Sequence, residues 1–316
     1  MSEPRGLLDH RLLVVTGKGG VGRTTVAAGL AVLAARTGRR TLLCESDPSG
    51  GLGTVLETGP LAYEPKVVEP GLQALAVDTE SALREYLQLQ LKLPLVARIG
   101  PLARTFDFVA NAAPGVREIL AIGKLGWEVR DGDHDLVVVD GPATGHVIAQ
   151  LRAPRAIDDL ITMGLVREQA EWLAALLSDR ATTGAVVVTT PEETPVTEAL
   201  ELVARLADDD VDVGLAGVVV NRVLPELFGR AEEEAFERLA TNGVDSLSAA
   251  VGADVGVVLD AARLAVGLRR SGATHLATLR AGLPEGVPVL YLPELFARDT
   301  GIRAVHRLAD HLADEL

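Results

Sequence analysis

Short, continuous runs of apolar residues recur along the chain, and longer helical segments separate them. Such runs are typical of strands that are buried on both faces of a parallel sheet. The alternation of these strands with helices predicts an α/β fold, in which a doubly wound, mainly parallel sheet is covered on both faces. We predict strands at residues 11–16, 40–45, 72–78, 135–140, 184–190, 213–221 and 287–292.

Residues 25–37 are apolar nearly all round, which indicates a buried helix, and we expect it to end at Gly38. Longer stretches without a strand-like run are expected to be helical. These stretches are 79–131, about 152–180, and 225–282. We expect residues 1–316 to form a single domain, with the first two stretches inserted as a helical subdomain at one end of the sheet.

Composition narrows the class of protein. Hydrophobic residues make up 48% of the 316 residues and aromatic residues only 3%, so the core must consist mainly of Ala, Val and Leu. The net charge of −14 argues against a nucleic-acid partner, because both polymers would repel each other. No signal peptide and no transmembrane run of about 18 apolar residues is recognisable. We therefore expect a cytoplasmic protein.

The segment GKGGVGRTT, residues 17–25, follows a predicted strand and opens a predicted helix. This is the context of a phosphate-binding loop, in which glycines let successive backbone N–H groups point into one concavity. Thr24 stands where a hydroxyl group ligates Mg²⁺, and Thr25 can reach the α-phosphate. The residues expected to bind nucleotide here are Gly17, Lys18, Gly19, Gly20, Val21, Gly22, Arg23, Thr24 and Thr25.

The loop departs from the strict pattern G-x-x-x-x-G-K-[ST] at one position, because Arg23 replaces the lysine. Arginine keeps the positive charge but is planar and bulkier, so this exchange is not conservative at a tight site. Three outcomes are open. Arg23 bridges the phosphates and supports slow turnover, or it allows binding but misplaces the γ-phosphate, or it points outward and leaves a subunit that depends on a partner.

Lys18 follows the first glycine directly, as GKGG. In this feature the chain resembles the dimeric P-loop ATPases with a deviant Walker A loop. That class includes the arsenite-pump ATPase, the tail-anchored-protein targeting ATPase, the Min and Par partition ATPases and the nitrogenase iron protein. The resemblance implies a P-loop NTPase fold, a dimer held together by ATP, and a Lys18 that reaches the phosphates of the partner subunit.

The segment ESDPSGGL, residues 45–52, resembles the switch I sequence D-P-A-H-N-L of the arsenite-pump and targeting ATPases. Asp47 and Pro48 match this sequence, and the next three residues depart from it. A carboxylate at Asp47 can orient the attacking water. We expect Asp47, Lys18 and Arg23 to be the catalytic residues.

The segment VVVDGPATGH, residues 137–146, resembles the switch II sequence D-T-A-P-T-G-H of the same family. Asp140 is a Walker B-type acid, so Thr24, Asp47 and Asp140 are expected to hold Mg²⁺, partly through water. Gly145 can donate its backbone N–H to a γ-phosphate. No role for His146 follows from the sequence.

Two later segments complete the resemblance. Asn221, in VVVNR, stands just past a strand end, where its amide can donate to and accept from the adenine edge. The segment YLPELF, residues 291–296, resembles the family's late loop against the base, with Pro293 and Glu294 as backbone contributors. The matching segments extend from residue 12 to about residue 296.

The number of cysteines distinguishes this chain from several members of the class that bind metals. A metalloid site needs a cluster of cysteines, a dimer zinc site needs Cys-x-x-Cys, and the iron–sulfur cluster needs two cysteines per subunit. The sequence contains one cysteine, Cys44. We therefore expect a bacterial-type, single-copy member that uses ATP and Mg²⁺ but neither zinc nor an iron–sulfur cluster.

Two functions remain open at this point. The first is an ATP-hydrolysing dimer whose nucleotide state switches its conformation to act on a client or partner protein. The second is a nucleotide-binding, weakly hydrolysing regulatory subunit that pairs with an active paralogue. The retained Asp47 and Lys18 favour the first, and Arg23 favours the second. The sequence decides neither between homodimer and heterodimer nor whether the inserted helices form a client groove.

Overall fold

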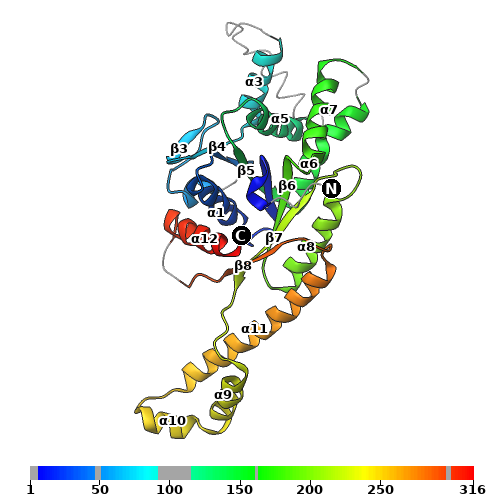
Figure 1. The fold of residues 1–316 in the computed structure, drawn as a ribbon. Helices are drawn as coiled ribbons and strands as arrows, with labels where there is room; N and C mark the ends of the chain where they lie inside the picture. Colours follow the sequence, from blue (N-terminus) through cyan, green and yellow to red (C-terminus); the bar gives the residue numbers. More distant parts are fainter. Residues whose placement is uncertain (1–5, 47–50, 92–114, 161–162, 297–299) are drawn as a thin grey trace.

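The structure is a computed structural model that describes residues 6–46, 51–91, 115–160, 163–296 and 300–316. Within these residues, an eight-stranded sheet in the order β3-β4-β2-β5-β1-β6-β7-β8 forms the centre of the molecule (Figure 1). All neighbouring strands pair in parallel except β3, which is antiparallel to β4. The strands are β1 (Leu12–Gly17), β2 (Thr41–Glu45), β3 (Lys66–Glu69), β4 (Leu72–Ala76), β5 (Leu136–Ala143), β6 (Thr183–Thr189), β7 (Leu215–Val223) and β8 (Val289–Pro293). The predicted α/β fold with a mainly parallel sheet is confirmed.

All seven predicted strands are present, and their boundaries differ from the predicted ones by three residues at most. Strand β3 was not predicted. It is four residues long, lies at the sheet edge, and begins with the exposed Lys66 and Val67. A short edge strand of this kind lacks the continuous apolar run that identifies a buried strand.

Helix α1 (Arg23–Arg36) packs against the sheet and beside the C-terminal helix α12 (Ile302–Glu315), which lies on the same face. All residues from Val26 to Ala35 are buried, as the apolar sequence predicts. A Cβ atom at Gly29 would lie 3.1 Å from Leu312 and 3.2 Å from Leu308, so a small residue is needed for the two helices to pack this closely. The helix that carries the phosphate-binding loop is therefore fixed on all sides.

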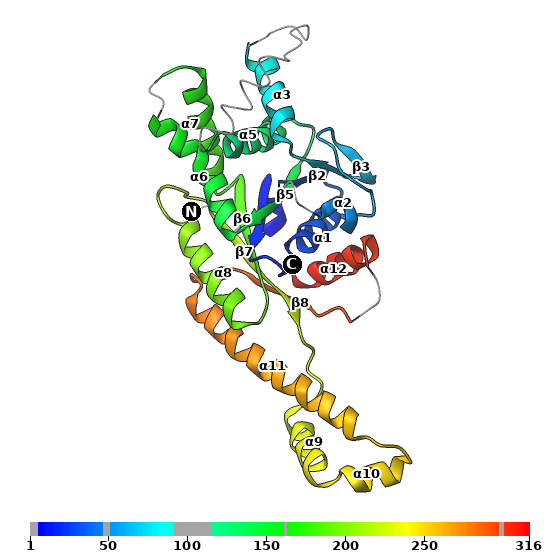
Figure 2. The same ribbon diagram turned by 180° about the vertical axis from the view of Figure 1, so that it is seen from behind.

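Further helices cover the opposite face of the sheet. Residues of α5, α6, α7 and α8 pack against one set of alternating strand residues, while α1 and α12 pack against the other set. In Figures 1 and 2, α3, α5 and α7 gather at one end of the molecule. The helices just named are α3 (Thr79–Leu91), α5 (Val116–Arg130), α6 (Thr144–Leu160), α7 (Leu165–Ser178) and α8 (Glu193–Leu206). Two short helices, η1 (Leu7–Asp9) and α2 (Leu52–Val55), lie earlier in the chain.

The predicted helical stretches 79–131 and 152–180 are helical where the structure describes them. Part of each stretch, residues 92–114 and 161–162, lies outside the described residues. The division of the chain into one domain with an inserted helical subdomain stays a prediction. None of the described helices combines the length and the apolar character that are needed to cross a bilayer.

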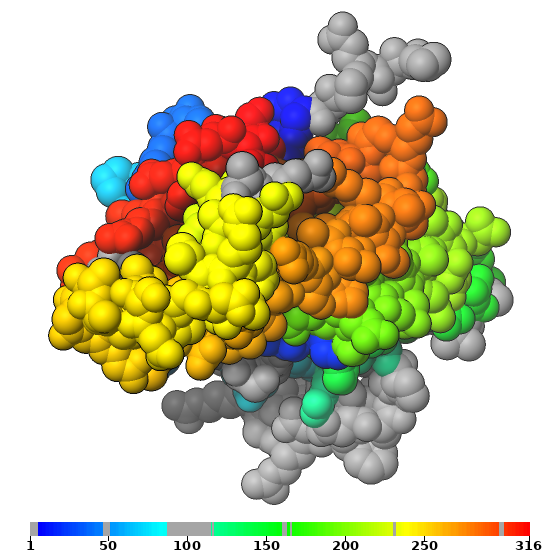
Figure 3. Space-filling model, turned by 90° about the horizontal axis from the view of Figure 1, so that it is seen from below, coloured from blue at the N-terminus to red at the C-terminus, as the bar shows by residue number. Residues whose placement is uncertain are grey.

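Three helices between β7 and β8 form a projection that we call the helix arm: α9 (Arg230–Asn242), α10 (Val244–Val251) and α11 (Gly256–Gly282). The C-terminal part of α11 packs against α8, where a Cβ atom at Gly282 would lie 2.8 Å from Leu200. The remainder of the arm extends away from the sheet (Figures 1 and 2). Seen from below, the arm points toward the viewer, so α9, α10 and α11 lie in the foreground (Figure 3).

Candidate nucleotide site

The loop after β1 has the backbone conformation of a phosphate-binding loop. Gly20 and Gly22 have φ angles of 88° and 92°, in the left-handed region that favours glycine. A Cβ atom at Gly22 would lie 2.4 Å from the side-chain amide nitrogen of Asn221. In contrast, nothing lies within 4 Å of a Cβ atom placed at Gly19 or Gly20. The loop therefore combines tight packing at its base with open space along its rim.

The helix after the loop presents its N-terminus to the same space. Helix α1 starts at Arg23, directly after Gly22, and glycine has no side chain that could cap the first-turn N–H groups. These N–H groups and the helix dipole favour an anion. The open rim of the loop and the uncapped start of the helix fit a bound polyphosphate, so the observed geometry supports the predicted nucleotide site.

Arg23 is turned toward the segment after β5. Its guanidinium group donates a hydrogen bond to the backbone carbonyl of Gly141. The hydroxyl group of Thr16 donates to the carbonyl of Pro142 at a distance of 3.1 Å. Two side chains of the loop region thus hold the 141–142 segment directly beside the phosphate-binding loop.

Asp140 lies in the buried part of β5, one residue before that part ends, in register with Val15 of β1 and Glu45 of β2. Only 4% of it is exposed. Its backbone carbonyl accepts a hydrogen bond from the backbone N–H of Ser46 at 3.1 Å. The pairing of the parallel strands thus brings Asp140, the phosphate-binding loop and the start of switch I to one edge of the sheet.

The chain just before Asp47 is also held by α6. The side-chain amide of Gln150 donates to the hydroxyl oxygen of Ser46 at 2.7 Å. Asp47 itself, predicted to be catalytic and to bind Mg²⁺, lies outside the described residues, as do Pro48, Ser49 and Gly50. Its roles therefore stay predictions.

Lys18 forms an ion pair within its own subunit. Its ammonium group binds the carboxylate of Glu198 on α8, and the two side chains are 33% and 32% exposed. A hollow of about 380 Å³ lies at this position, between the loop and the start of α8. Its lining residues are Lys18, Gly19, Gly20, Val21, Thr190, Glu192, Glu193, Thr194, Pro195 and Arg222.

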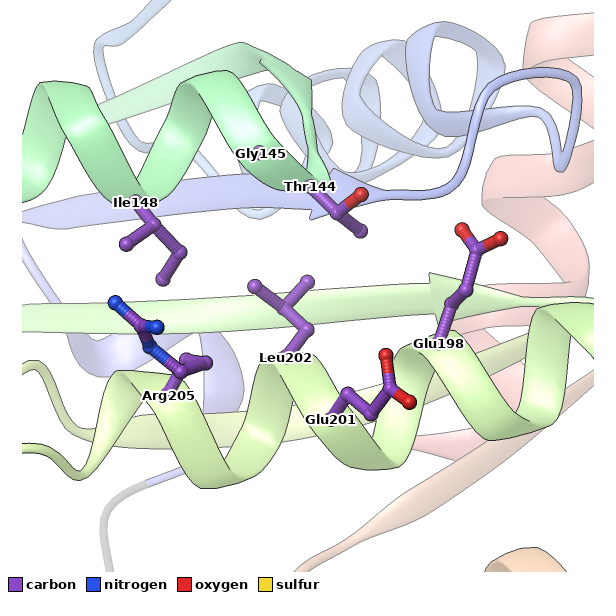
Figure 4. A pocket seen from close by; sticks show the side chains of 7 residues that line it. All are labelled: Thr144, Gly145, Ile148, Glu198, Glu201, Leu202 and Arg205. Atoms are coloured by element: carbon purple, nitrogen blue, oxygen red, sulfur yellow. The ribbon is translucent and has the colours of Figure 1, made fainter.

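A second groove of about 550 Å³ runs between α6 and α8 (Figure 4). Thr144, Gly145 and Ile148 at the start of α6 face Glu198 and Leu202 of α8 across it. Gly145, in the first turn of α6, is exposed, as is its neighbour His146. Glu198 lies at the end of this groove and also binds Lys18, so it connects the groove with the phosphate-binding loop.

Asn221 and Pro293 lie near each other at the ends of adjacent parallel strands, because β7 pairs with β8 and Val223 lies opposite Pro293. The side-chain amide of Asn221 donates to the carbonyl of Val21 in the loop at 2.9 Å, and the residue is buried. The backbone N–H of Glu294 donates to the carbonyl of Val223 at 2.9 Å. Asn221 thus supports the loop in this structure, and its contact with adenine stays a prediction.

Sequence reasoning missed Glu198 and Arg222. Glu198 is 180 positions away from Lys18, and a glutamate on an amphipathic helix carries no signal for such a contact. Arg222 lies beside the loop with a φ angle of 59°, which is uncommon for a residue other than glycine. Backbone strain of this kind is often concentrated at functional sites, but it cannot be read from the sequence VVVNR.

Comparison with known proteins finds similarity to ATPases, in agreement with the nucleotide site predicted from the sequence. The sequence profile of a family described as anion-transporting ATPase matches residues 10–172. The chain is 32% identical to ATPase BagA of Mycobacterium tuberculosis, over 99% of this chain and 95% of that protein. It is 28% identical to an arsenical pump-driving ATPase of Escherichia coli, over 72% of this chain and 41% of that protein. The similarity to BagA thus extends over both the sheet and the helix arm.

Proposed function

The chain belongs to the family of anion-transporting ATPases and is an ATPase of the P-loop class, and on this premise we propose that it works as a dimer. ATP bound by both subunits holds the dimer together, and hydrolysis changes its conformation so that it acts on a client or partner protein. The observation that carries this proposal is the position of Lys18, which lies at the rim of the phosphate-binding loop with its side chain one-third exposed.

Residues of one subunit bind the phosphates. The backbone N–H groups from Gly17 to Thr25 surround the phosphate oxygens, since nothing in the described structure fills the rim at Gly19 and Gly20. Thr24, Asp47 and Asp140 would hold Mg²⁺, partly through water, and the bound ion would offset phosphate charge. Asp47 orients the attacking water and accepts its proton. Asn221 and Pro293 form the side of the site against the base.

Lys18 acts across the dimer interface. In the isolated subunit its ammonium group binds Glu198, so this ion pair must open before Lys18 can bind the phosphates of the partner subunit. The exchange replaces one carboxylate by a more highly charged polyphosphate, so it is favourable only when nucleotide is present. Lys18 therefore makes dimer formation depend on ATP.

A second candidate function is the weakly hydrolysing subunit that pairs with an active paralogue. The contact between Arg23 and the carbonyl of Gly141 favours it, because this hydrogen bond directs the guanidinium group to switch II. An arginine held in this way places less positive charge beside the phosphates than the lysine of the strict pattern would. In such a pair, the paralogue would contain the site that hydrolyses ATP faster.

Phosphate release under steady-state conditions distinguishes the two functions. The wild type is compared with Arg23→Lys and Asp47→Asn, and the rise in Tm with Mg²⁺ and ATP is measured for each to show that nucleotide binds. An active enzyme hydrolyses ATP at least about tenfold faster than Asp47→Asn, since a general base contributes 10²-fold or more. A wild type that is as slow as Asp47→Asn, next to a fast Arg23→Lys, supports the regulatory subunit instead.

We also propose a cytoplasmic location and a protein partner. The strong negative charge opposes binding to nucleic acid. Whether the partner subunit is a second copy or a paralogue is tested by purification of the native protein with and without ATP. A second family member that elutes only with ATP would establish a heterodimer.

A further inference from the structure

An apolar stripe on the helix arm faces solvent. Val257, Leu264 and Leu268 of α11 are 75%, 64% and 54% exposed, and Ala261 between them is also exposed. Their spacing of four, three and four residues places them within about 60° of one another on the helix. We call these four residues the α11 seam. An apolar spacing that alternates between three and four residues is the pattern of helices that pair with another helix.

The seam lies opposite the side of α11 that packs within the arm. Val266, nine residues after Val257 and so half a turn away on the helix wheel, is only 8% exposed. On this inner side, Arg270 forms an ion pair with Glu233 of α9 at 2.8 Å. The arm therefore already uses one face of α11 for its own packing, and the seam is a second face that α9 does not cover.

The residues beside the seam carry little charge. Val258 and Ala265 flank it on one side, and Asp260 and Gly267 flank it on the other. Such a surface offers no row of charges that would select a partner of opposite sign. Two identical seams can pair without opposing rows of like charge, and the small residues Ala261 and Gly267 allow two helices to approach closely.

The seam is too small to hold a partner alone. From Val257 to Leu268 it extends over only about 17 Å of helix, while a stable interface normally buries 1,200–2,000 Å². A short seam can bind a partner that another contact already holds nearby, because the seam contact then forms within one complex. This requirement favours an occupant that binds the same molecule elsewhere.

A second copy of this chain meets the requirement. The arm leaves the sheet after Val223, at the C-terminal end of β7, and the phosphate-binding loop follows the C-terminal end of β1. These strands run in the same direction through β6, so both features lie at the same edge of the sheet. We propose that, when ATP joins two copies at this edge, their α11 seams pack against each other as a second dimer contact. The proposal rests on the ATP-linked dimer proposed above.

Cysteine cross-linking tests the contact directly. Leu264 lies near the middle of the seam, so two copies of Leu264→Cys come together in either orientation of the helices. Native Cys44 is buried and does not compete. With Mg²⁺ and a non-hydrolysable ATP analogue, mild oxidation by copper phenanthroline is expected to link Leu264→Cys within the dimer. Leu239→Cys, an exposed arm position outside the seam, serves as the matched control.

Charge substitution provides the second test. Leu264→Glu is expected to weaken the nucleotide-dependent dimer about tenfold in sedimentation velocity, as for the loss of a well-packed interface residue, and Leu239→Glu is expected to leave it unchanged. Since both leucines are exposed in the monomer, neither change should lower its Tm. An equal Tm therefore shows that a loss of dimer does not reflect unfolding.

The outcomes separate the seam from the proposed function. If the wild type dimerises with nucleotide but Leu264→Cys links no faster than Leu239→Cys, and Leu264→Glu has no effect, the seam contact is wrong and the ATP-linked dimer stands. If nucleotide raises the Tm but no dimer forms at all, both the dimer and the seam contact are wrong. A helix of another protein that occupies the seam, while the two seams stay apart in the ATP-bound dimer, also overturns the proposal.

Discussion

In the proposed dimer, Glu198 and a phosphate group of the partner subunit would compete for the same ammonium group, that of Lys18, which binds Glu198 in the free subunit. The ion pair is about one-third exposed, so water screens it and its strength is modest. A weak pair of this kind can hold Lys18 in the free subunit and still release it to a triphosphate. The charge on Glu198 therefore influences how much ATP is needed for two subunits to join.

We predict that Glu198→Gln lowers the ATP concentration for half-maximal dimer formation about two- to fivefold, which corresponds to about 0.5–1 kcal/mol for a partly exposed pair. Sedimentation velocity across an ATP titration measures the shift. Glu201→Gln is the control, since Glu201 lines the same groove between α6 and α8 one turn further along α8. An equal shift in both variants would mean that general surface charge, and not the pair with Lys18, is responsible.

Gly22 links the loop to Asn221. We predict that Gly22→Ala destabilises the fold by at least about 2 kcal/mol, because alanine is strained in the left-handed region and its Cβ atom would collide with the Asn221 amide. The variant should also lose the rise in Tm with Mg²⁺ and ATP. Denaturant titration and thermal unfolding measure both effects.

Gly19→Ala is the control for the loop glycines, because nothing lies within 4 Å of its Cβ atom. It should unfold at the same denaturant concentration as the wild type. Equal stability of all three proteins would show that the loop near Gly22 can move away from Asn221 at little cost.

At the scale of residues, the sequence predicted the position of residues that belong to a local motif, while their roles stay predictions. Gly20, Gly22 and Asp140 are predictable because the motif fixes both the residue type and its place after a strand. Glu198 and Arg222 are not, since the first depends on a contact over 180 positions and the second on a backbone angle. The contact between Arg23 and Gly141 was not predictable either, because the sequence left three outcomes for Arg23 open and none of them named a partner for its guanidinium group.

Among the helices, α5 is held by a buried group of charges. Lys124 lies 2.9 Å from Glu128 and 3.1 Å from Glu85 of α3, and it also contacts the ring of Tyr63. His134 lies 3.4 Å from Glu128. Burial alone would raise the pKa of Glu128, but hydrogen bonds with His134 and Lys124 outweigh it and lower this pKa. These contacts join α3 and α5 to the chain before β5.

We predict that Glu128→Gln destabilises the protein at pH 7 by about 3 kcal/mol. The substitution removes one of the two carboxylates that balance the positive charge of the buried Lys124. The wild-type contribution is present above the ordinary glutamate pKa of about 4.3, and it is lost as the pH falls toward the lower pKa of the folded state. The Tm difference between the two proteins should therefore shrink below about pH 4.5, which thermal unfolding from pH 7 to pH 3 measures.

Glu80→Gln provides a matched control on α3, since the pair of Glu80 with Arg84 is more than half exposed. Its effect should stay below about 0.5 kcal/mol at pH 7. If Glu128→Gln is as mild as Glu80→Gln, the buried group does not stabilise α5.

The strands and helix α1 were predictable because their apolar runs are continuous, and the helices within 79–131, about 152–180 and 225–282 because these stretches lack strand-like runs. Strand β3 was not, since half of its four residues are exposed. For the arm, the sequence indicated helices over 225–282, but their projection from the sheet depends on packing. Gly282 against α8 and the buried Val266 take part in that packing, and neither residue stands out in the sequence.

For the whole molecule, the C-terminal edge of the sheet is the central feature. The phosphate-binding loop, Asp140, the start of α6 and the start of the arm all lie there, because parallel strands end on the same side. A nucleotide at this edge can therefore influence Lys18, the groove between α6 and α8, and the arm together. This arrangement suits a molecule in which one ligand controls both hydrolysis and association.

If ATP joins two subunits and hydrolysis separates them, blocking the chemical step must prolong the dimer. We predict that Asp47→Asn forms a dimer with Mg²⁺ and ATP that lasts at least about tenfold longer than the wild-type dimer, because the attacking water loses its base. Sedimentation velocity at intervals after addition of limiting ATP measures the decay. Lys18→Ala should bind nucleotide, seen as a rise in Tm, but form no dimer. Equal lifetimes for Asp47→Asn and wild type, with hydrolysis abolished only in the variant, would show that association does not depend on turnover and that nucleotide exchange alone controls the dimer.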